Sequence, residues 1–203
     1  MNAIRFVRFL VGLLAVIMVM LAAAPFMWEL IYPMPYADLI HQYAGQNDLD
    51  PYLVAAVILA ESRFNTKATS PKDARGLMQI LPSTGEWLAG AVNLEGYTSE
   101  QLYEAEVSIM LGTWYLRELQ CQFGDNLPAA LAAYNAGPTT VQKWLDEGCW
   151  DGRSEDVDNV PYGETRNYIT RVLTNYEAYL QIHGREATLA TSVIRRAWAL
   201  LSR

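Results

Sequence analysis

Side chains that commonly bind metals are scarce in this sequence. Its 203 residues include only two histidines and two cysteines. His41 and His183 lie far apart in the chain, and the separation of Cys121 from Cys149 does not match the short ligand spacings of a zinc site. We therefore expect neither a metal centre nor another cofactor, and we interpret both histidines as helix-surface residues.

The sequence also has no surplus of basic residues outside its two ends. Between Tyr36 and His183 there are 9 Lys and Arg against 20 Asp and Glu. Because nucleic-acid binding depends on basic surfaces, this composition argues against a nucleic-acid partner. Internal repeats and low-complexity tracts are absent as well. The length and an apolar content of 52% suit one packed domain with short appendages.

Charge is absent from one long segment near the N-terminus. Phe9 to Trp28 is an uninterrupted run of 20 uncharged residues, which is long enough to cross the hydrocarbon region of a bilayer. Two arginines precede it, so we expect its N-terminus in the cytoplasm and the rest of the chain outside. Residues 1–31 are thus predicted to form a membrane anchor, followed by a short stiff spacer at 32–35. The small residues at 22–24 leave a cleaved signal peptide, and hence a secreted protein, as the alternative.

A carboxylate stands on the apolar side of a helix expected over residues 50–62. The segment 50–62 opens with an N-cap aspartate and a proline at the first helical position, which predicts a helix start. The face formed by spacings of three, four and seven residues carries Val54, Val57, Ile58 and Glu61. Burial would raise the pKa of the Glu61 carboxyl. A carboxyl that is still protonated near neutral pH can act as a general acid.

Two nearby arginines offer a structural alternative for this carboxylate. An ion pair with Arg63 or Arg75 at the edge of the core would also perturb the pKa of Glu61. Three further motifs favour the catalytic interpretation. They are Gly76-Leu77-Met78-Gln79 with Pro82 and Thr84, Ala133-Tyr134-Asn135-Ala136-Gly137-Pro138, and Glu164-Thr165 with Tyr168.

Together with Glu61-Ser62, these motifs occur in the order found in a known family. The chain resembles the soluble-lytic-transglycosylase type of catalytic domain, a goose-lysozyme-like family that cleaves bacterial peptidoglycan. Each motif alone is a weak pattern, whereas four in order are highly specific. The resemblance covers residues 36–183, which is most of the chain.

The resemblance implies a mainly α fold of the α+β lysozyme-like class, with a small irregular or β lobe. Periodicity alone predicts the helices but not the lobe. It places a short helix over 36–44 and a long helix from the capping box at Thr98 to about Phe123. Residues 184–203 form a basic C-terminal tail that could be helical.

The resemblance also implies a reaction. The family cleaves the β-1,4 bond between N-acetylmuramic acid and N-acetylglucosamine and leaves 1,6-anhydromuramic acid ends. Glu61 would act first as acid and then as base, with assistance from the N-acetyl group of the muramoyl sugar. The implied partner is the glycan strand of peptidoglycan, and no metal is involved. The oligomeric state stays open.

Six further residues are expected to contact the substrate. Ser70 matches a family serine near the assisting N-acetyl group, although a plain turn serine before Pro71 is its structural alternative. Gln79 offers donors and an acceptor to sugar groups. The remaining candidates are Met78, Tyr134, Asn135 and Tyr168, of which Met78 is otherwise core filler and Asn135 equally suits a structural helix end. We interpret Glu164 as bracing its helix start.

Other functions remain as alternatives. A hydrolytic muramidase on the same fold would need a second acid to activate water, and Asp73 is the nearest candidate by sequence. The family commonly has glycine there, so Asp73 is interpreted as a left-handed turn residue. A wall-associated structural or assembly factor is a further alternative. Cys121 and Cys149 have about equal prospects of forming a disulfide or of remaining free thiols.

Overall fold

The protein was analysed as a computed structural model, which describes residues 3–184. The predicted tail helix therefore lies outside the described residues. The chain divides into two units, one ending at Met34 and the other beginning at Pro35. The first unit contains one helix, α1 (Ala3–Ile31).

Helix α1 runs without a break through the uncharged segment and is 29 residues long. Its described apolar side chains are exposed, as Phe9 (67%) and Val19 (68%) illustrate. Nevertheless, within the described part of the chain no helix is both long and apolar enough to span a membrane. The structure therefore confirms the helix but does not support the prediction of a membrane-spanning anchor.

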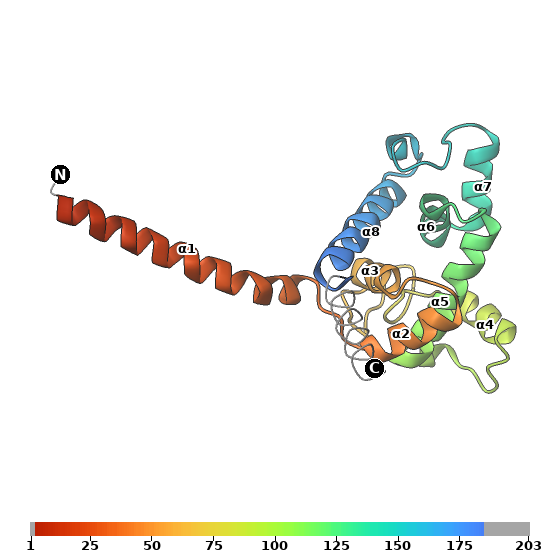
Figure 1. Ribbon diagram of the computed structural model, residues 1–203. Coiled ribbons are helices and arrows are strands. Elements are labelled where there is room, and N and C mark those ends of the chain that lie inside the picture. Colours follow the sequence, from red (N-terminus) through yellow and green to blue (C-terminus); the bar gives the residue numbers. More distant parts are fainter. Residues whose placement is uncertain (1–2, 185–203) are drawn as a thin grey trace, which may run out of the picture. The chain divides into compact units, whose positions relative to one another are not determined.

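The second unit is built from helices around one core (Figure 1). Its α-helices are α2 (Ala37–Gln46), α3 (Pro51–Glu61), α4 (Pro82–Ala91), α5 (Ala105–Gln122), α6 (Leu127–Ala136), α7 (Pro138–Asp146) and α8 (Gly163–Ile182). Among its described residues there are also two short 3-10 helices, η1 (Ser99–Tyr103) and η2 (Val157–Asn159). The mainly helical fold predicted from the sequence is confirmed.

Helix α3 is the most deeply buried element near the candidate site. Residues 53–58 are all buried, so the helix is covered on every side rather than on the single face that the spacing predicted. It packs mainly against α8 and also touches α2. The sequence explains its start, because the side chain of Asp50 accepts a hydrogen bond from the Tyr52 amide and Pro51 occupies the first turn.

The predicted long helix after Thr98 is wrong in one respect. The capping box at Thr98 is present, but it opens the 3-10 helix η1 rather than α5. The chain breaks at Glu104, which has extended backbone angles and precedes α5. Leu102 is completely buried in this first segment, so packing of η1 redirects the chain before the long helix begins.

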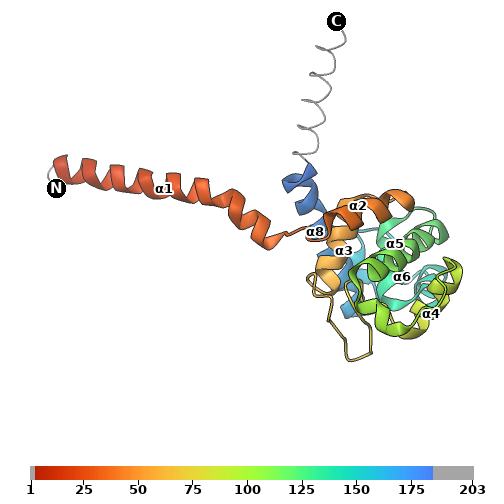
Figure 2. The same cartoon turned by 90° about the horizontal axis from the view of Figure 1, so that it is seen from below.

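The lobe between α3 and α4 is irregular. The loop after α3 extends away from the helices and returns to α4 (Figure 2). It contains only two isolated β-bridges, one from Thr69 to Arg75 and one from Arg75 to Ile80. The small irregular or β lobe implied by the family resemblance therefore contains no extended strand among its residues.

The two cysteines are not paired with each other. Cys121 on α5 and Cys149 after α7 are both free and exposed. The structure thus agrees with the free-thiol alternative for these residues.

Candidate active site

Glu61 is the last residue of α3, where the buried helix ends. The chain turns sharply after it, because Arg63 and Phe64 both adopt left-handed backbone angles, with φ of 52° and 62°. The Ser62 hydroxyl secures this turn by donating a hydrogen bond of 2.8 Å to the carbonyl of Leu77. The end of α3 is thereby tied to the loop that carries the second motif.

The Glu61 carboxyl is surrounded by protein although the residue keeps some access to solvent. Burial raises its pKa from 4.5 to about 7. Interaction with the Tyr168 hydroxyl and the positive charge of Arg171 oppose this change and lower the pKa, while the negative charge of Glu164 raises it. Glu61 is therefore half protonated near neutral pH, which suits a group that gives and then takes a proton.

Tyr168 stands on α8 and its side chain is 1% exposed. Its hydroxyl is buried and has no hydrogen-bond partner of ordinary length among the described residues. The interaction with Glu61 that lowers the carboxyl pKa therefore lacks the geometry of an ordinary hydrogen bond. Hydrogen bonds of catalytic groups are often long in an unliganded protein and shorten when substrate is bound.

Tyr134, near the end of α6, lies close enough to Glu61 to feel the charge of its carboxylate. Burial raises the pKa of its phenol well above 10, and the negative charge of Glu61 adds to this effect. Its hydroxyl donates a hydrogen bond of 2.9 Å to the backbone carbonyl of Met78. Tyr134 therefore remains a neutral phenol and joins α6 to the loop.

The turn at residues 76–79 depends on two glycines. Gly76 has a φ of 73°, and a Cβ atom there would come within 1.8 Å of the Leu102 carbonyl oxygen. A Cβ atom on Gly112 of α5 would lie 2.3 Å from the sulfur of Met78. The Met78 side chain is accordingly fully buried against α5, so the structure places it in the core rather than toward solvent.

Gln79 follows in a left-handed conformation, with a φ of 49°. Its amide nitrogen donates hydrogen bonds to the carbonyls of Ala68 (3.2 Å) and Gly76 (3.0 Å). The side chain thus braces the loop with its donors. Its carbonyl oxygen accepts no hydrogen bond from the described residues and is available to a ligand.

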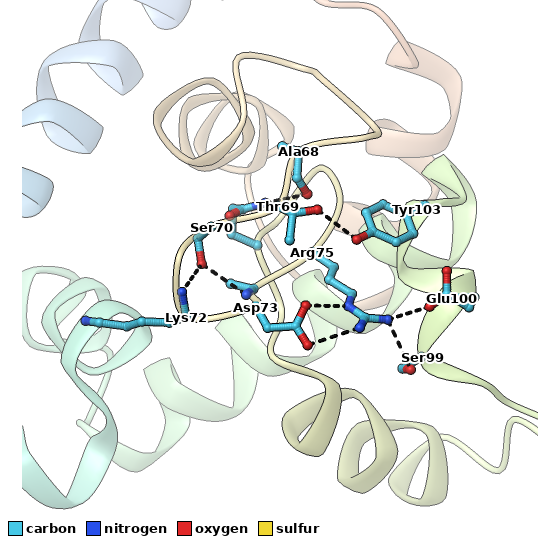
Figure 3. A network of polar contacts seen from close by, with 11 residues as sticks. Ala68, Thr69, Ser70, Lys72, Asp73, Arg75, Ser99, Glu100 and Tyr103 are labelled. Atoms are coloured by element: carbon cyan, nitrogen blue, oxygen red, sulfur yellow. Dashed lines mark hydrogen bonds and ion pairs between the residues drawn. The ribbon is translucent and has the colours of Figure 1, made fainter.

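Ser70 occupies a tight turn in the same loop (Figure 3). Its hydroxyl oxygen accepts hydrogen bonds from the amides of Lys72 (3.2 Å) and Ala74 (3.0 Å). This is the geometry of a turn serine, the structural alternative considered for this residue. Since both contacts use the oxygen as acceptor, the hydroxyl proton is still free to be donated.

Asp73 has a φ of 64°, which confirms that it is a left-handed turn residue. Its carboxylate receives two hydrogen bonds from Arg75, at 2.9 and 3.0 Å. These bonds lower the pKa of Asp73. Arg75 also reaches Glu100 at 2.7 Å, and its guanidinium lies over the Tyr103 ring (Figure 3).

Asn135 and Glu164 both connect neighbouring segments. The Asn135 side-chain oxygen accepts a hydrogen bond of 2.8 Å from the Thr165 hydroxyl, which links α6 to the start of α8. Glu164 lies in the first turn of α8 and forms an exposed ion pair of 3.7 Å with Lys72. Asn135 therefore has a structural contact, and Glu164 ties α8 to the Ser70 loop.

The structure brings Glu61, Tyr134 and Tyr168 together, although they come from three different helices. The alternative of an ion pair between Glu61 and Arg63 or Arg75 is not found among the described contacts, and Arg75 pairs instead with Asp73 and with Glu100 of η1. The positive charge that acts on Glu61 belongs to Arg171. Sequence reasoning missed this residue, although it stands three positions after Tyr168, with its guanidinium over that ring.

Comparison with known proteins identifies the family of this chain. The model of the transglycosylase SLT domain family matches residues 38–156. Since this match covers more than half of the chain, the protein belongs to the transglycosylase SLT domain family. The family resemblance inferred from the four motifs is thereby confirmed.

Curated relatives and solved structures point the same way. The chain is 37% identical over 166 residues to the soluble lytic murein transglycosylase of Escherichia coli K12, covering 79% of this chain and 25% of the relative. It is 27% identical to the membrane-bound lytic murein transglycosylase C of Actinobacillus pleuropneumoniae, covering 72% of this chain and 46% of that protein.

Two crystal structures share the fold. The 70 kDa soluble lytic transglycosylase of E. coli has a TM-score of 0.73 and 34% identity, with coverage of 77% of this chain and 26% of that one. An inactive glutamate-to-glutamine mutant of lytic transglycosylase Slt from Pseudomonas aeruginosa has a TM-score of 0.68 and 32% identity, with coverage of 74% and 24%. The chain thus spans about a quarter of the length of these structures and of the E. coli relative.

Proposed function

We propose that this protein is a peptidoglycan lytic transglycosylase. Its reaction would cleave the β-1,4 bond between N-acetylmuramic acid and N-acetylglucosamine and leave a 1,6-anhydromuramoyl end. The observation that carries the proposal is the Glu61 carboxyl, which burial brings to a pKa of about 7 while the residue keeps access to solvent. The relatives named above are lytic transglycosylases, and one of them is inactive with glutamine in place of a glutamate.

In the proposed mechanism Glu61 moves two protons. Protonated Glu61 gives its proton to the glycosidic oxygen as the bond to C1 breaks, and the carbonyl oxygen of the N-acetyl group supports C1. The Glu61 carboxylate then removes the proton of the 6-hydroxyl while O6 forms a bond to C1. The carboxyl is protonated again at the end, so that the cycle needs no water and no cofactor.

The other candidate residues would either hold the sugar or support the groups around Glu61. The free proton of the Ser70 hydroxyl can be donated to the N-acetyl oxygen, because its oxygen already accepts two amides. The unengaged carbonyl oxygen of Gln79 can accept from a sugar hydroxyl. Tyr168 would donate to the Glu61 carboxylate after the first proton transfer. Met78 would act indirectly by positioning Tyr134, and Asn135 by positioning the start of α8.

A hydrolytic muramidase is the second candidate, and one observation supports it. Hydrolysis needs a second carboxylate near Glu61 that can act as a base and activate a water molecule. Glu164 is such a carboxylate, because its charge acts on Glu61. Asp73 is less suitable, because Arg75 occupies both of its oxygens. Against Glu164 stands its exposure and its ion pair with Lys72.

Digestion of purified wall material in ¹⁸O-labelled water tests the two reactions. A lytic transglycosylase produces unlabelled 1,6-anhydro ends, because the tethered 6-hydroxyl competes with an effective molarity of roughly 10⁵ M or more. Mass spectrometry of the fragments reads the label. Mostly labelled reducing ends would show hydrolysis, and loss of that label in Glu164→Gln would identify the base. Since peptidoglycan lies outside the cytoplasmic membrane, the domain would act there.

A further inference from the structure

A hollow of about 650 Å³ lies between α4, α5 and α7, away from Glu61. This size is typical of a pocket for a small ligand. Its lining combines two aromatic rings, Trp87 and Tyr115, with polar groups from Thr84, Glu118 and Gln122. A second, more open hollow adjoins it at Gln122 and Pro138.

Trp87 gives this hollow its distinctive surface. Its side chain is 54% exposed, which is unusual for a residue that is normally largely buried. The ring is nevertheless held in place, because it makes T-shaped contacts with Trp114 at 5.8 Å and with Tyr115 at 5.9 Å. The indole is therefore a solvent-facing aromatic surface with a fixed orientation. Its side chain loses little conformational entropy when a ligand binds.

Contacts between aromatic rings connect the lining of the hollow to the candidate active site. Tyr115 contacts Trp87 on one side and Tyr134 on the other, the latter with centroids 5.4 Å apart. The phenol of Tyr134 feels the charge of Glu61. Thr84 belongs to α4, which begins directly after the 76–81 turn. Trp87 thus lies two side chains away from the groups around Glu61.

The charge of the hollow indicates which part of a peptidoglycan strand it would bind. Glu118 is the charged residue of the lining, and the adjoining hollow adds Asp146, Glu147 and Lys143. This negative surface disfavours peptide stems and lactyl groups, which carry carboxylates. An N-acetylglucosamine ring is uncharged, with an apolar face for an indole and hydroxyls for Thr84 and Gln122.

We propose that Trp87 is the platform of a distal glycan subsite that binds an N-acetylglucosamine residue of the same strand that Glu61 cleaves. This inference rests on the proposed function for its substrate. It predicts that strands long enough to occupy the Trp87 subsite together with the groups around Glu61 are cleaved better than shorter strands.

Cleavage of glycan strands of defined length tests the subsite. In Trp87→Ala, kcat/KM for long strands should fall about tenfold, mainly through KM, whereas the shortest strands that the protein cleaves should keep the wild-type rate. Trp87→Phe should keep most of the preference. Trp28→Ala, with a similarly exposed tryptophan in the first unit, is the matched control. Equal losses on short and long strands, or none on long strands, would overturn the proposal.

A binding measurement separates this proposal from the proposed function. In Glu61→Gln, chitohexaose should bind more tightly than chitobiose and should shift the NMR signal of the Trp87 indole N–H. The additional Trp87→Ala change should remove the preference for the hexamer. A Trp87 signal that responds to isolated stem peptide rather than to chitohexaose would refute the subsite. Absence of anhydro ends with intact chitohexaose binding would instead refute only the reaction.

Discussion

The helical side of the candidate active site and its loop side differ in how their ionisable groups are surrounded. On the helical side, formed by α3, α6 and α8, the ionisable groups Glu61, Tyr134 and Tyr168 are crowded by protein, and burial raises the pKa of each. On the loop side, residues 65–80, charged side chains are paired with side chains of opposite charge, as in the pair of Asp73 with Arg75. Packing thus determines the pKa values of the ionisable groups on the helical side. Hydrogen bonds and ion pairs determine the shape of the loop on the other side.

The largest expected effect comes from removing the proton donor on the helical side. Glu61→Gln keeps the size of the side chain and should reduce the cleavage rate by at least about 100-fold, which is the scale of general acid catalysis. Release of fragments from purified wall material measures this. Lysis close to the wild-type rate would end the assignment of Glu61.

The same substitution should have the reverse effect on stability. Because the pKa of Glu61 is raised from 4.5 to about 7, the folded state binds this proton more tightly than the unfolded state. The carboxyl therefore costs stability increasingly between these pH values, reaching about 3 kcal/mol above pH 7. Glu61→Gln should gain about 1–3 kcal/mol at pH 8 and little at pH 4. Urea unfolding at both pH values measures the gain; equal gains would contradict burial as the cause.

A smaller effect is expected from the buried tyrosine. Tyr168→Phe removes an interaction that lowers the pKa of Glu61, so the alkaline limb of the pH–rate profile should move to higher pH. The rate at neutral pH should stay within about tenfold of wild type. Tyr176→Phe, on the same helix but bonded to Asp50, is the control and should leave the profile in place. An unmoved profile in Tyr168→Phe would mean that its hydroxyl does not act on Glu61.

The smallest effect belongs to the loop side. Lys72→Ala breaks an exposed ion pair with Glu164, and such pairs contribute less than about 1 kcal/mol. We expect nearly unchanged unfolding free energy and a cleavage rate within about twofold of wild type. High salt should mimic the substitution in the wild-type protein. A large loss of activity in this variant would show that the loop side also depends on charge.

The sequence predicts the helical side well, because its features are local. The N-cap and proline that start α3 lie in one short segment and are found. On the loop side, the turn at Asp73 is equally local and is also found. The raised pKa of Glu61 follows from its place after an apolar helical run. Burial around the whole of α3 was not predicted, since it depends on how α8 and α2 cover the helix.

Long-range contacts account for what the sequence did not predict. Arg171 acts on Glu61 across α3 and α8, and no spacing rule joins residues 110 positions apart. The burial of Met78 depends on a glycine of α5 that only the fold brings near. The roles of Ser70, Gln79 and Asn135 toward sugar stay predictions, as their protein contacts are those of loop and helix-end residues.

Because Glu61 lies at the end of α3, the pKa of its carboxyl depends on how tightly the neighbouring helices pack around it. Its raised pKa exists only while α8 and its neighbours keep water from the carboxyl. A substitution that lets water in between α3 and α8 returns the pKa toward 4.5 before the domain unfolds. The acid would then be ionised at neutral pH, and activity would decline there while surviving at lower pH. In this protein, a shift of the pH optimum of activity to lower pH would therefore reveal loosened packing before thermal unfolding does.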